Sequence, residues 1–142
     1  MAGYLGDEDA SLKKMRWGGI ATGDRFYRDE TGTFHFCGRL DDLVKRDDIR
    51  IFLHEVEHAI LTIKGVASAS VVQHGEKLVA FVSVKKPMDE LTLRRLCREC
   101  LIICKVPDRF VVLDELPQTT AGKIDRGELR RLAQETLHVS PP

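Results

Sequence analysis

Apolar residues recur with helical spacing in two stretches of the chain. At about 100° per residue, the apolar positions of residues 52–63 fall on one face of a helix. In residues 89–103 the apolar positions follow i, i+3, i+4, i+7 and i+11 spacing, with Asp89 at the start. The first face comprises Phe52, Leu53, Val56, Ala59, Ile60 and Ile63, and the second comprises Leu93, Leu96, Cys97, Cys100 and Cys104. A third helix is expected over residues 126–137.

The segments between these helices have the composition of strands and turns. Residues 20–37 contain two strand-like runs separated by Asp29-Glu30-Thr31-Gly32, which predicts a β-hairpin. A short strand, LVK, and an acidic turn at residues 46–48 follow, and the runs VASASVVQ and KLVAFVSV form a second expected hairpin. RFVVL is the last expected strand. This order predicts the α+β class: a small mixed sheet with packed helices, preceded by a hairpin.

Length and charge narrow the class of protein. A chain of 142 residues can bury roughly 68–70% of its unfolded surface, so its core needs neither disulfides nor a metal. The formal net charge of zero lacks the basic footprint of a nucleic-acid binder. No apolar run is long enough to cross a membrane, and charged residues occupy the place of a signal peptide. We expect a cytoplasmic protein with reduced thiols, and neither a nucleic acid nor a membrane as a partner.

Two patterns imitate metal sites. His54-Glu55-Val56-Glu57-His58 matches HExxH, in which two histidines bind zinc and the glutamate acts as general base. On the expected helix, however, His54 and His58 lie opposite the apolar face, and position 61 is Leu. We interpret them as solvated histidines, with a zinc hydrolase as the alternative. Likewise Cys97, Cys100 and Cys104 lie on an apolar seam and are expected to be buried structural thiols. We therefore predict no metal site.

Three short polar elements are not needed for a core. Thr22-Gly23-Asp24 places a carboxylate beside a glycine, Gly38-Arg39-Leu40-Asp41-Asp42 combines an arginine with paired acids, and Thr119-Thr120-Ala121-Gly122-Lys123 is a loop of small residues ending in lysine. A carboxylate can bind both hydroxyls of a ribose. Taken singly, each element could equally be a bulge, a polar linker or an ordinary turn. The break at residues 38–42 is the expected domain boundary, separating residues 1–38 from 39–142.

In order and spacing, these elements resemble the C-terminal part of the adenylate-forming superfamily of acyl-CoA synthetases, luciferases and nonribosomal-peptide adenylation enzymes. The resemblance begins at Gly3-Tyr4 and continues through TGDRFYRDETGTFHFCGRLDDLVK. It ends with VPDRFVVLDELPQTTAGKIDR, which is similar to the family's VPxxFVxLxxLPxTxxGKxDR. The resemblance implies that residues 1–38 are the last segment of a large N-terminal adenylation domain and that residues 39–142 are the C-terminal lid domain.

The resemblance also implies the roles of individual residues. Asp24 would bind the ribose hydroxyls of ATP, Arg39 would support the ribose and phosphate end, and Asp41 would be the hinge. Lys123 would be the catalytic lysine, bridging the substrate carboxylate and the α-phosphate, where a positioned ammonium stabilises charge that grows in the transition state. The complete enzyme would use ATP and Mg²⁺.

A second face of the lid would serve thioester formation. This thiolation face would hold the loop with Lys45, Asp48 and Arg50, and Asp48 stands where the family usually has glycine. Asp can adopt the left-handed conformation but adds bulk and charge near a pantetheine arm. The DDxVK and GKIDR patterns favour a carrier protein over coenzyme A as the thiol acceptor.

The family's acid pocket and phosphate loop have no counterpart in these residues. We therefore expect the chain to be inactive without an N-terminal adenylation domain or subunit, and to form a complex with it or a homo-oligomer through exposed groups such as Trp17, Ile20 and Phe26. The alternative function is a non-catalytic module, derived from this domain, that binds a partner or a carrier protein.

Overall fold

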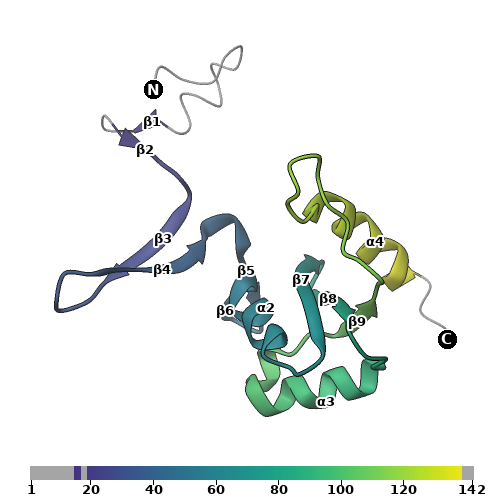
Figure 1. Cartoon of the computed structure of the whole chain (residues 1–142). Coiled ribbons are helices and arrows are strands. Elements are labelled where there is room, and N and C mark those ends of the chain that lie inside the picture. Colours follow the sequence, from purple (N-terminus) through teal and green to yellow (C-terminus); the bar gives the residue numbers. More distant parts are fainter. Residues whose placement is uncertain (1–14, 17–18, 139–142) are drawn as a thin grey trace. The chain divides into compact units, whose positions relative to one another are not determined.

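The computed structural model describes residues 15–16 and 19–138, and it divides the chain into two compact units between Asp41 and Asp42 (Figure 1). Gly3-Tyr4, where the family resemblance begins, lies outside the described residues, as does Trp17. The assignment of the first unit to a larger N-terminal domain stays a prediction.

The first unit is built from two antiparallel strand pairs. β1 (Met15–Arg16) pairs with β2 (Gly19–Ile20), and β3 (Asp24–Arg28) pairs with β4 (Phe34–Arg39). The Asp29 carboxylate closes the β3–β4 turn by accepting hydrogen bonds from the amides of Thr31 and Thr33. The hairpin predicted from the sequence is therefore confirmed, with Gly32 at a positive φ of 88°.

The second unit begins where the 3₁₀ helix η1 (Leu40–Asp42) ends. A short hairpin of β5 (Leu43–Arg46) and β6 (Ile49–Phe52) leads into α2 (Leu53–Leu61). β7 (Val66–His74) and β8 (Lys77–Val84) form an antiparallel pair, followed by α3 (Glu90–Cys100) and η2 (Ile103–Lys105). β9 (Arg109–Val112) pairs in parallel with β8, and α4 (Arg126–His138) ends the described chain.

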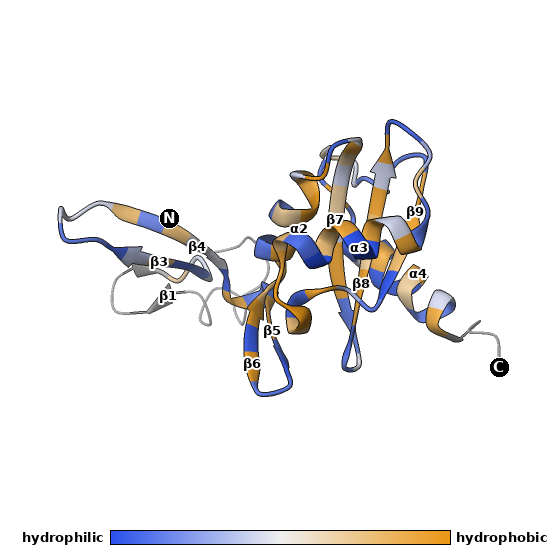
Figure 2. Cartoon of the chain, turned by 90° about the horizontal axis from the view of Figure 1, so that it is seen from below, coloured by the Kyte–Doolittle hydropathy of each residue, from blue (hydrophilic) through white to orange (hydrophobic). Residues whose placement is uncertain are grey.

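The mixed sheet β7-β8-β9 separates two apolar clusters, because alternate side chains of β8 point to opposite faces. Leu78, Ala80 and Val82 pack with residues of α2 and α3, whereas Val79 and Phe81 pack with Leu129 and Ala133 of α4. Figure 1 accordingly shows the strands between α3 and α4, and Figure 2 shows β8 as a largely hydrophobic strand. The predicted α+β class is confirmed.

The helix boundaries differ from the expected ones at both amphipathic stretches. Phe52 is extended and belongs to β6, so the first helix starts at Leu53. The second ends at Cys100 because Leu101 is extended, whereas the periodicity predicted a helix to residue 103. Asp89 caps this helix as predicted, its side chain accepting from the Thr92 amide at 2.8 Å. β6 was not predicted from the sequence.

Candidate functional site

Lys123 lies in a closed loop between β9 and α4. Residues Gln118 and Ile124 form a β-bridge, and the Thr119 amide donates to the carbonyl of Lys123 at 2.7 Å. The Gly122 amide donates to the Thr119 carbonyl at 2.9 Å, with Gly122 at a φ of +73° that favours glycine. The loop therefore presents an exposed Lys123 from an ordered backbone.

The base of this loop is tied down where α4 begins. Asp125 caps α4, because its carboxylate accepts from the Glu128 amide at 3.0 Å. Arg126 follows, with Nη1 2.8 Å from Asp42 Oδ1 and Nη2 2.9 Å from Glu57 Oε1. One guanidinium thus joins the first turn of α4 to α2 and to the end of η1.

Glu57 is a half-buried carboxyl group with several partners. Its Oε1 accepts from the Val71 amide at 2.8 Å and from the Ser70 hydroxyl at 3.1 Å. Burial raises the pKa of Glu57, and the hydrogen bond from Val71 and the charge of Arg126 oppose this shift. The pairing of Glu57 with Arg126 was not predicted from the sequence, because no local pattern links residues so far apart in the chain.

The first unit brings together three residues that come from two separate sequence motifs. Asp24 pairs with Arg39 across the β3–β4 ladder, with Arg39 Nε 3.9 Å from Asp24 Oδ1. Arg39 Nη2 lies 3.7 Å from Asp41 Oδ2 and donates to the Thr22 carbonyl at 3.4 Å. Asp24, Arg39 and Asp41 therefore form one polar cluster. Lys123 belongs to the second unit.

Lys45, Asp48 and Arg50 lie on the β5–β6 hairpin and are all exposed. Lys45 pairs with Arg50 across the ladder, and Lys45 Nζ lies 2.6 Å from Asp48 Oδ1. Asp48 has a φ of 62° and Asp47 a φ of 49°, so both residues of the turn are left-handed. Two successive left-handed residues match the type I′ turn of two-residue hairpins. The left-handed conformation was considered from the sequence for Asp48 and not for Asp47.

The HExxH histidines do not share one environment. His58 is exposed as predicted, but His54 is half-buried, and its ring meets Phe52 edge-on at a centroid distance of 5.7 Å. The prediction of a solvated pair is therefore wrong for His54, because Phe52 in β6 covers it. Within the described residues, no group of three His, Cys, Asp or Glu side chains could hold a metal ion.

The cysteines of α3 also differ from the prediction. Cys97 is buried, and burial raises the pKa of its thiol to about 12, which leaves it inert. Cys100 is exposed and Cys104 is half-buried, so their prediction as buried thiols is wrong. The helix ends at Cys100, which takes Cys104 out of the helical register.

No helix in the described part of the chain is long and apolar enough to span a membrane.

Comparison with known proteins identifies the family of this arrangement. Residues 55–123 match the AMP-binding enzyme C-terminal domain. The chain is 39% identical over 144 residues to 4-hydroxybutyrate–CoA ligase 1 of Metallosphaera sedula, covering 93% of this chain and 26% of that protein. It is 36% identical over 141 residues to 2-succinylbenzoate–CoA ligase of Geobacillus kaustophilus, covering 94% and 29%.

Solved structures agree with these relatives. ATP-bound MatB from Rhodopseudomonas palustris matches this chain with a TM-score of 0.80 at 28% identity. The match covers 94% of this chain and 28% of the MatB chain. The o-succinylbenzoate coenzyme A synthetase of Bacillus subtilis with ATP and magnesium ion has a TM-score of 0.80 at 32% identity, covering 92% and 28%. The chain spans between a quarter and a third of the length of these relatives. It belongs to the adenylate-forming superfamily and carries the C-terminal domain of these enzymes.

Proposed function

We propose that the chain is the lid part of an ATP-dependent enzyme that activates a carboxylic or amino acid as acyl-AMP and transfers the acyl group to a pantetheine thiol. The observation that carries this proposal is the closed loop from Pro117 to Asp125, which holds Lys123 at the surface. A fixed ammonium suits the adenylation step, because two anions meet when a carboxylate attacks the α-phosphate. Lys123 is the catalytic residue of this proposal.

The polar cluster of the first unit suits the nucleotide. Asp24 supplies a carboxylate for the two ribose hydroxyls, and Arg39 a guanidinium for the ribose and phosphate end. The Asp24 side chain is 28% exposed, and that of Asp41 81%. A partly sheltered carboxylate suits ligand binding, and an exposed residue between the two units suits a hinge. ATP and Mg²⁺ are the proposed cofactors, because the similar synthetase of Bacillus subtilis is described in complex with both. We assign no magnesium ligand to this chain.

The proposed partner of the chain is an N-terminal adenylation domain. Aromatic side chains on both faces of the β3–β4 hairpin are more than half exposed: Phe26 at 51%, Tyr27 at 56%, Phe34 at 68% and Phe36 at 54%. A two-stranded hairpin is marginally stable by itself. We infer that these side chains pack against the rest of the large domain, in line with the length of the relatives.

The acceptor thiol belongs to coenzyme A or to a carrier protein. The relatives from Metallosphaera sedula and Geobacillus kaustophilus are coenzyme A ligases, which favours coenzyme A. The carrier-protein preference rests on the DDxVK and GKIDR patterns and stays a prediction. Loading each acceptor with the same acyl-adenylate in parallel reactions distinguishes the two.

ATP–pyrophosphate exchange tests the proposal. The assay uses a panel of amino, aryl and aliphatic acids, with this chain alone and with the N-terminal adenylation domain supplied. We expect exchange only in the combined sample, and a decrease on the order of 10² to 10³ for Lys123→Ala. Lys86→Ala, at another exposed lysine, is the matched control and leaves exchange unchanged.

Three outcomes would contradict parts of this proposal. Acyl-AMP formation by the chain alone would refute its dependence on a second domain. Full exchange with Lys123→Ala would refute the role of the lysine. No ATP–pyrophosphate exchange in a combined sample whose two parts are shown to associate would favour the alternative, a non-catalytic binding module.

A further inference from the structure

The tip of the β5–β6 hairpin needs an anchor outside its own ladder. At its base Ile51 is fully buried, but both turn residues, Asp47 and Asp48, are exposed. Neither turn residue is glycine, so each bears the cost of a left-handed conformation. The Lys45–Asp48 ion pair within the tip is exposed on both sides, and such pairs contribute little.

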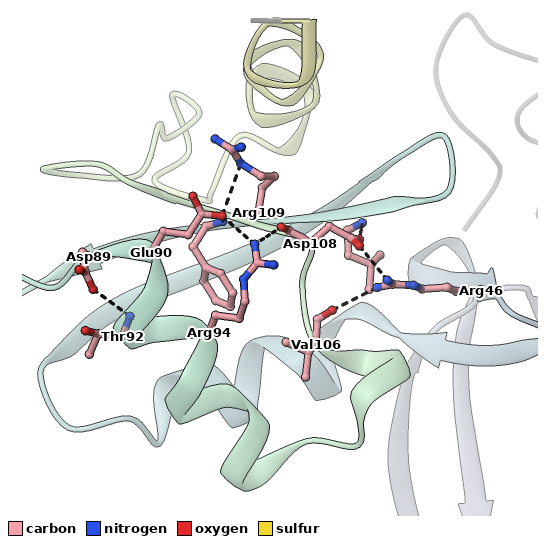
Figure 3. A network of polar contacts seen from close by, with 10 residues as sticks. Arg46, Asp89, Glu90, Thr92, Arg94, Val106, Asp108 and Arg109 are labelled. Atoms are coloured by element: carbon pink, nitrogen blue, oxygen red, sulfur yellow. Dashed lines mark hydrogen bonds and ion pairs between the residues drawn. The ribbon is translucent and has the colours of Figure 1, made fainter. Parts of the chain in front are cut away.

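Arg46 supplies a contact from this tip to the body of the domain (Figure 3). Its Nη2 donates to Asp108 Oδ1 at 2.8 Å and its Nη1 donates to the Val106 carbonyl at 3.1 Å. The Arg46 side chain is 19% exposed and that of Asp108 28%. A guanidinium that uses two nitrogens in a partly buried site is held more firmly than a surface ion pair.

Asp108 is itself fixed from three sides. Its Oδ2 accepts from the Leu78 amide at 2.8 Å, and its own amide donates to the Leu78 carbonyl at 2.8 Å. Arg94 of α3 donates to the Asp108 carbonyl (Figure 3). One carboxylate oxygen of Asp108 thus accepts a hydrogen bond from the start of β8, and the other accepts one from Arg46.

We propose that Arg46 is a positioning residue that holds the thiolation-face hairpin in place through Asp108. This proposal rests on the proposed function, because it assumes that the hairpin faces the acceptor thiol. A small displacement of the reacting groups from their productive positions can lower the rate by about 10²-fold. The Lys123 loop is held by its own backbone hydrogen bonds and by the ion pairs of Arg126, which do not involve the hairpin tip. Loosening the tip therefore leaves adenylation intact.

Separate assays of the two half-reactions test this role in the protein combined with its N-terminal domain. We expect Arg46→Gln to slow acyl transfer to the thiol by about tenfold or more, with ATP–pyrophosphate exchange unchanged. Arg46→Lys keeps the charge and restores part of the transfer rate. Asp108→Asn keeps an oxygen for the Leu78 amide and should behave like Arg46→Gln. Arg131→Gln, at an exposed arginine on α4, is the control.

Hydrogen exchange in the 142-residue chain gives a readout independent of activity. The amides of the tip, residues 46–49, should exchange faster in Arg46→Gln and as in wild type in Arg131→Gln. Unchanged tip exchange, a normal thiol-transfer rate in Arg46→Gln, or equal losses in both half-reactions would each overturn the role of Arg46. A combined wild-type protein that forms neither acyl-AMP nor thioester would instead contradict the proposed function, and this role with it.

Discussion

Arg126 Nη2 donates to both carboxylate oxygens of Glu57, at 2.9 and 3.0 Å, while Nη1 binds Asp42. The side chains of Glu57 and Asp42 are only 14% and 16% exposed, and that of Arg126 is 28% exposed. Removing the guanidinium would therefore leave two sheltered carboxylates without their cation. Stability of the domain should depend on Arg126 more than on any exposed ion pair of α4.

We expect Arg126→Gln to lower the free energy of unfolding by about 2 to 4 kcal/mol, because an unpaired buried charge is costly. Urea denaturation followed by circular dichroism measures this change. Arg131→Gln is the control on the same helix, since Arg131 is 59% exposed and pairs with Glu128 and Glu135. Its effect should stay below about 1 kcal/mol. Equal unfolding midpoints for the two variants would refute the importance of the Arg126 pairing.

Glu57 should give the domain a characteristic pH dependence. Burial holds its folded pKa above 4.5, so in the interval above 4.5 the folded state binds more protons than the unfolded state. The stability that this shift contributes is fully present at pH values below the pKa of Glu57 in the unfolded state. It is lost as the pH rises through the pKa of Glu57 in the folded state.

Unfolding free energies of wild type and Glu57→Gln, measured side by side between about pH 4 and 7, isolate this contribution. We expect the wild-type advantage to shrink as the pH rises, because Gln does not titrate and other groups cancel in the difference. A wild-type advantage that grows with pH would show that the ion pair with Arg126 outweighs burial.

The elements that sequence predicted well are those with a strong periodic signal. The faces with Val56 and Ile60, and with Leu93 and Cys97, are buried as expected, because tertiary packing followed the amphipathic pattern. β6 was missed since Ile49–Phe52 is short and runs directly into a helix with no turn between them. The helical spacing of apolar residues includes Phe52, so it gave no sign that β6 ends and α2 begins between Phe52 and Leu53.

The candidate site was predictable only where the residue types themselves imply chemistry. Lys123 and Asp24 stand beside glycines in motifs that a core does not require, so the sequence alone singled them out. The pairing of Glu57 with Arg126 joins residues 69 positions apart, and no local pattern encodes it. Long-range ion pairs depend on how α2 and α4 pack against β7, which the sequence analysis did not specify.

The Asp29 carboxylate should titrate far below an ordinary aspartate. Hydrogen bonds from the Thr31 side chain and from His35 lower its pKa to about 2. A lowered pKa means that the stability it gives the β3–β4 turn is present above the unfolded value of 3.8 and is lost as the pH falls through about 2.

Carboxyl-carbon NMR titration of the chain checks this value residue by residue. Thr31→Ala removes the hydroxyl 2.6 Å from Asp29 Oδ1 and should raise the Asp29 pKa toward 3.8. Thr33→Ser is the control, because serine keeps both the amide that binds Asp29 and the hydroxyl that lies 3.0 Å from the Thr31 hydroxyl. Equal shifts in the two variants would contradict the assignment of the effect to the Thr31 hydroxyl.

Asp48 offers a stabilising substitution on the β5–β6 hairpin. Its φ of 62° is left-handed, a conformation that costs an L-residue with a Cβ up to about 1–2 kcal/mol and costs glycine almost nothing. We expect Asp48→Gly to raise the free energy of unfolding by about 0.5–1 kcal/mol, since the exposed ion pair with Lys45 that it removes is worth less. Asp48→Val, with a branched side chain, should lower it by about 1–2 kcal/mol.

Thermal and urea unfolding of these variants give the comparison. Asp114→Gly is the matched control: Asp114 is exposed, and among the described residues other than glycine only Asp47 and Asp48 have positive φ. At Asp114 a glycine adds freedom to the unfolded chain without relieving strain, so it should bring no gain. An equal gain at both positions would mean that removing a negative charge, and not the left-handed backbone, accounts for the effect. A loss at Asp48→Gly would instead show that the Lys45–Asp48 contact stabilises this turn more than its exposure suggests.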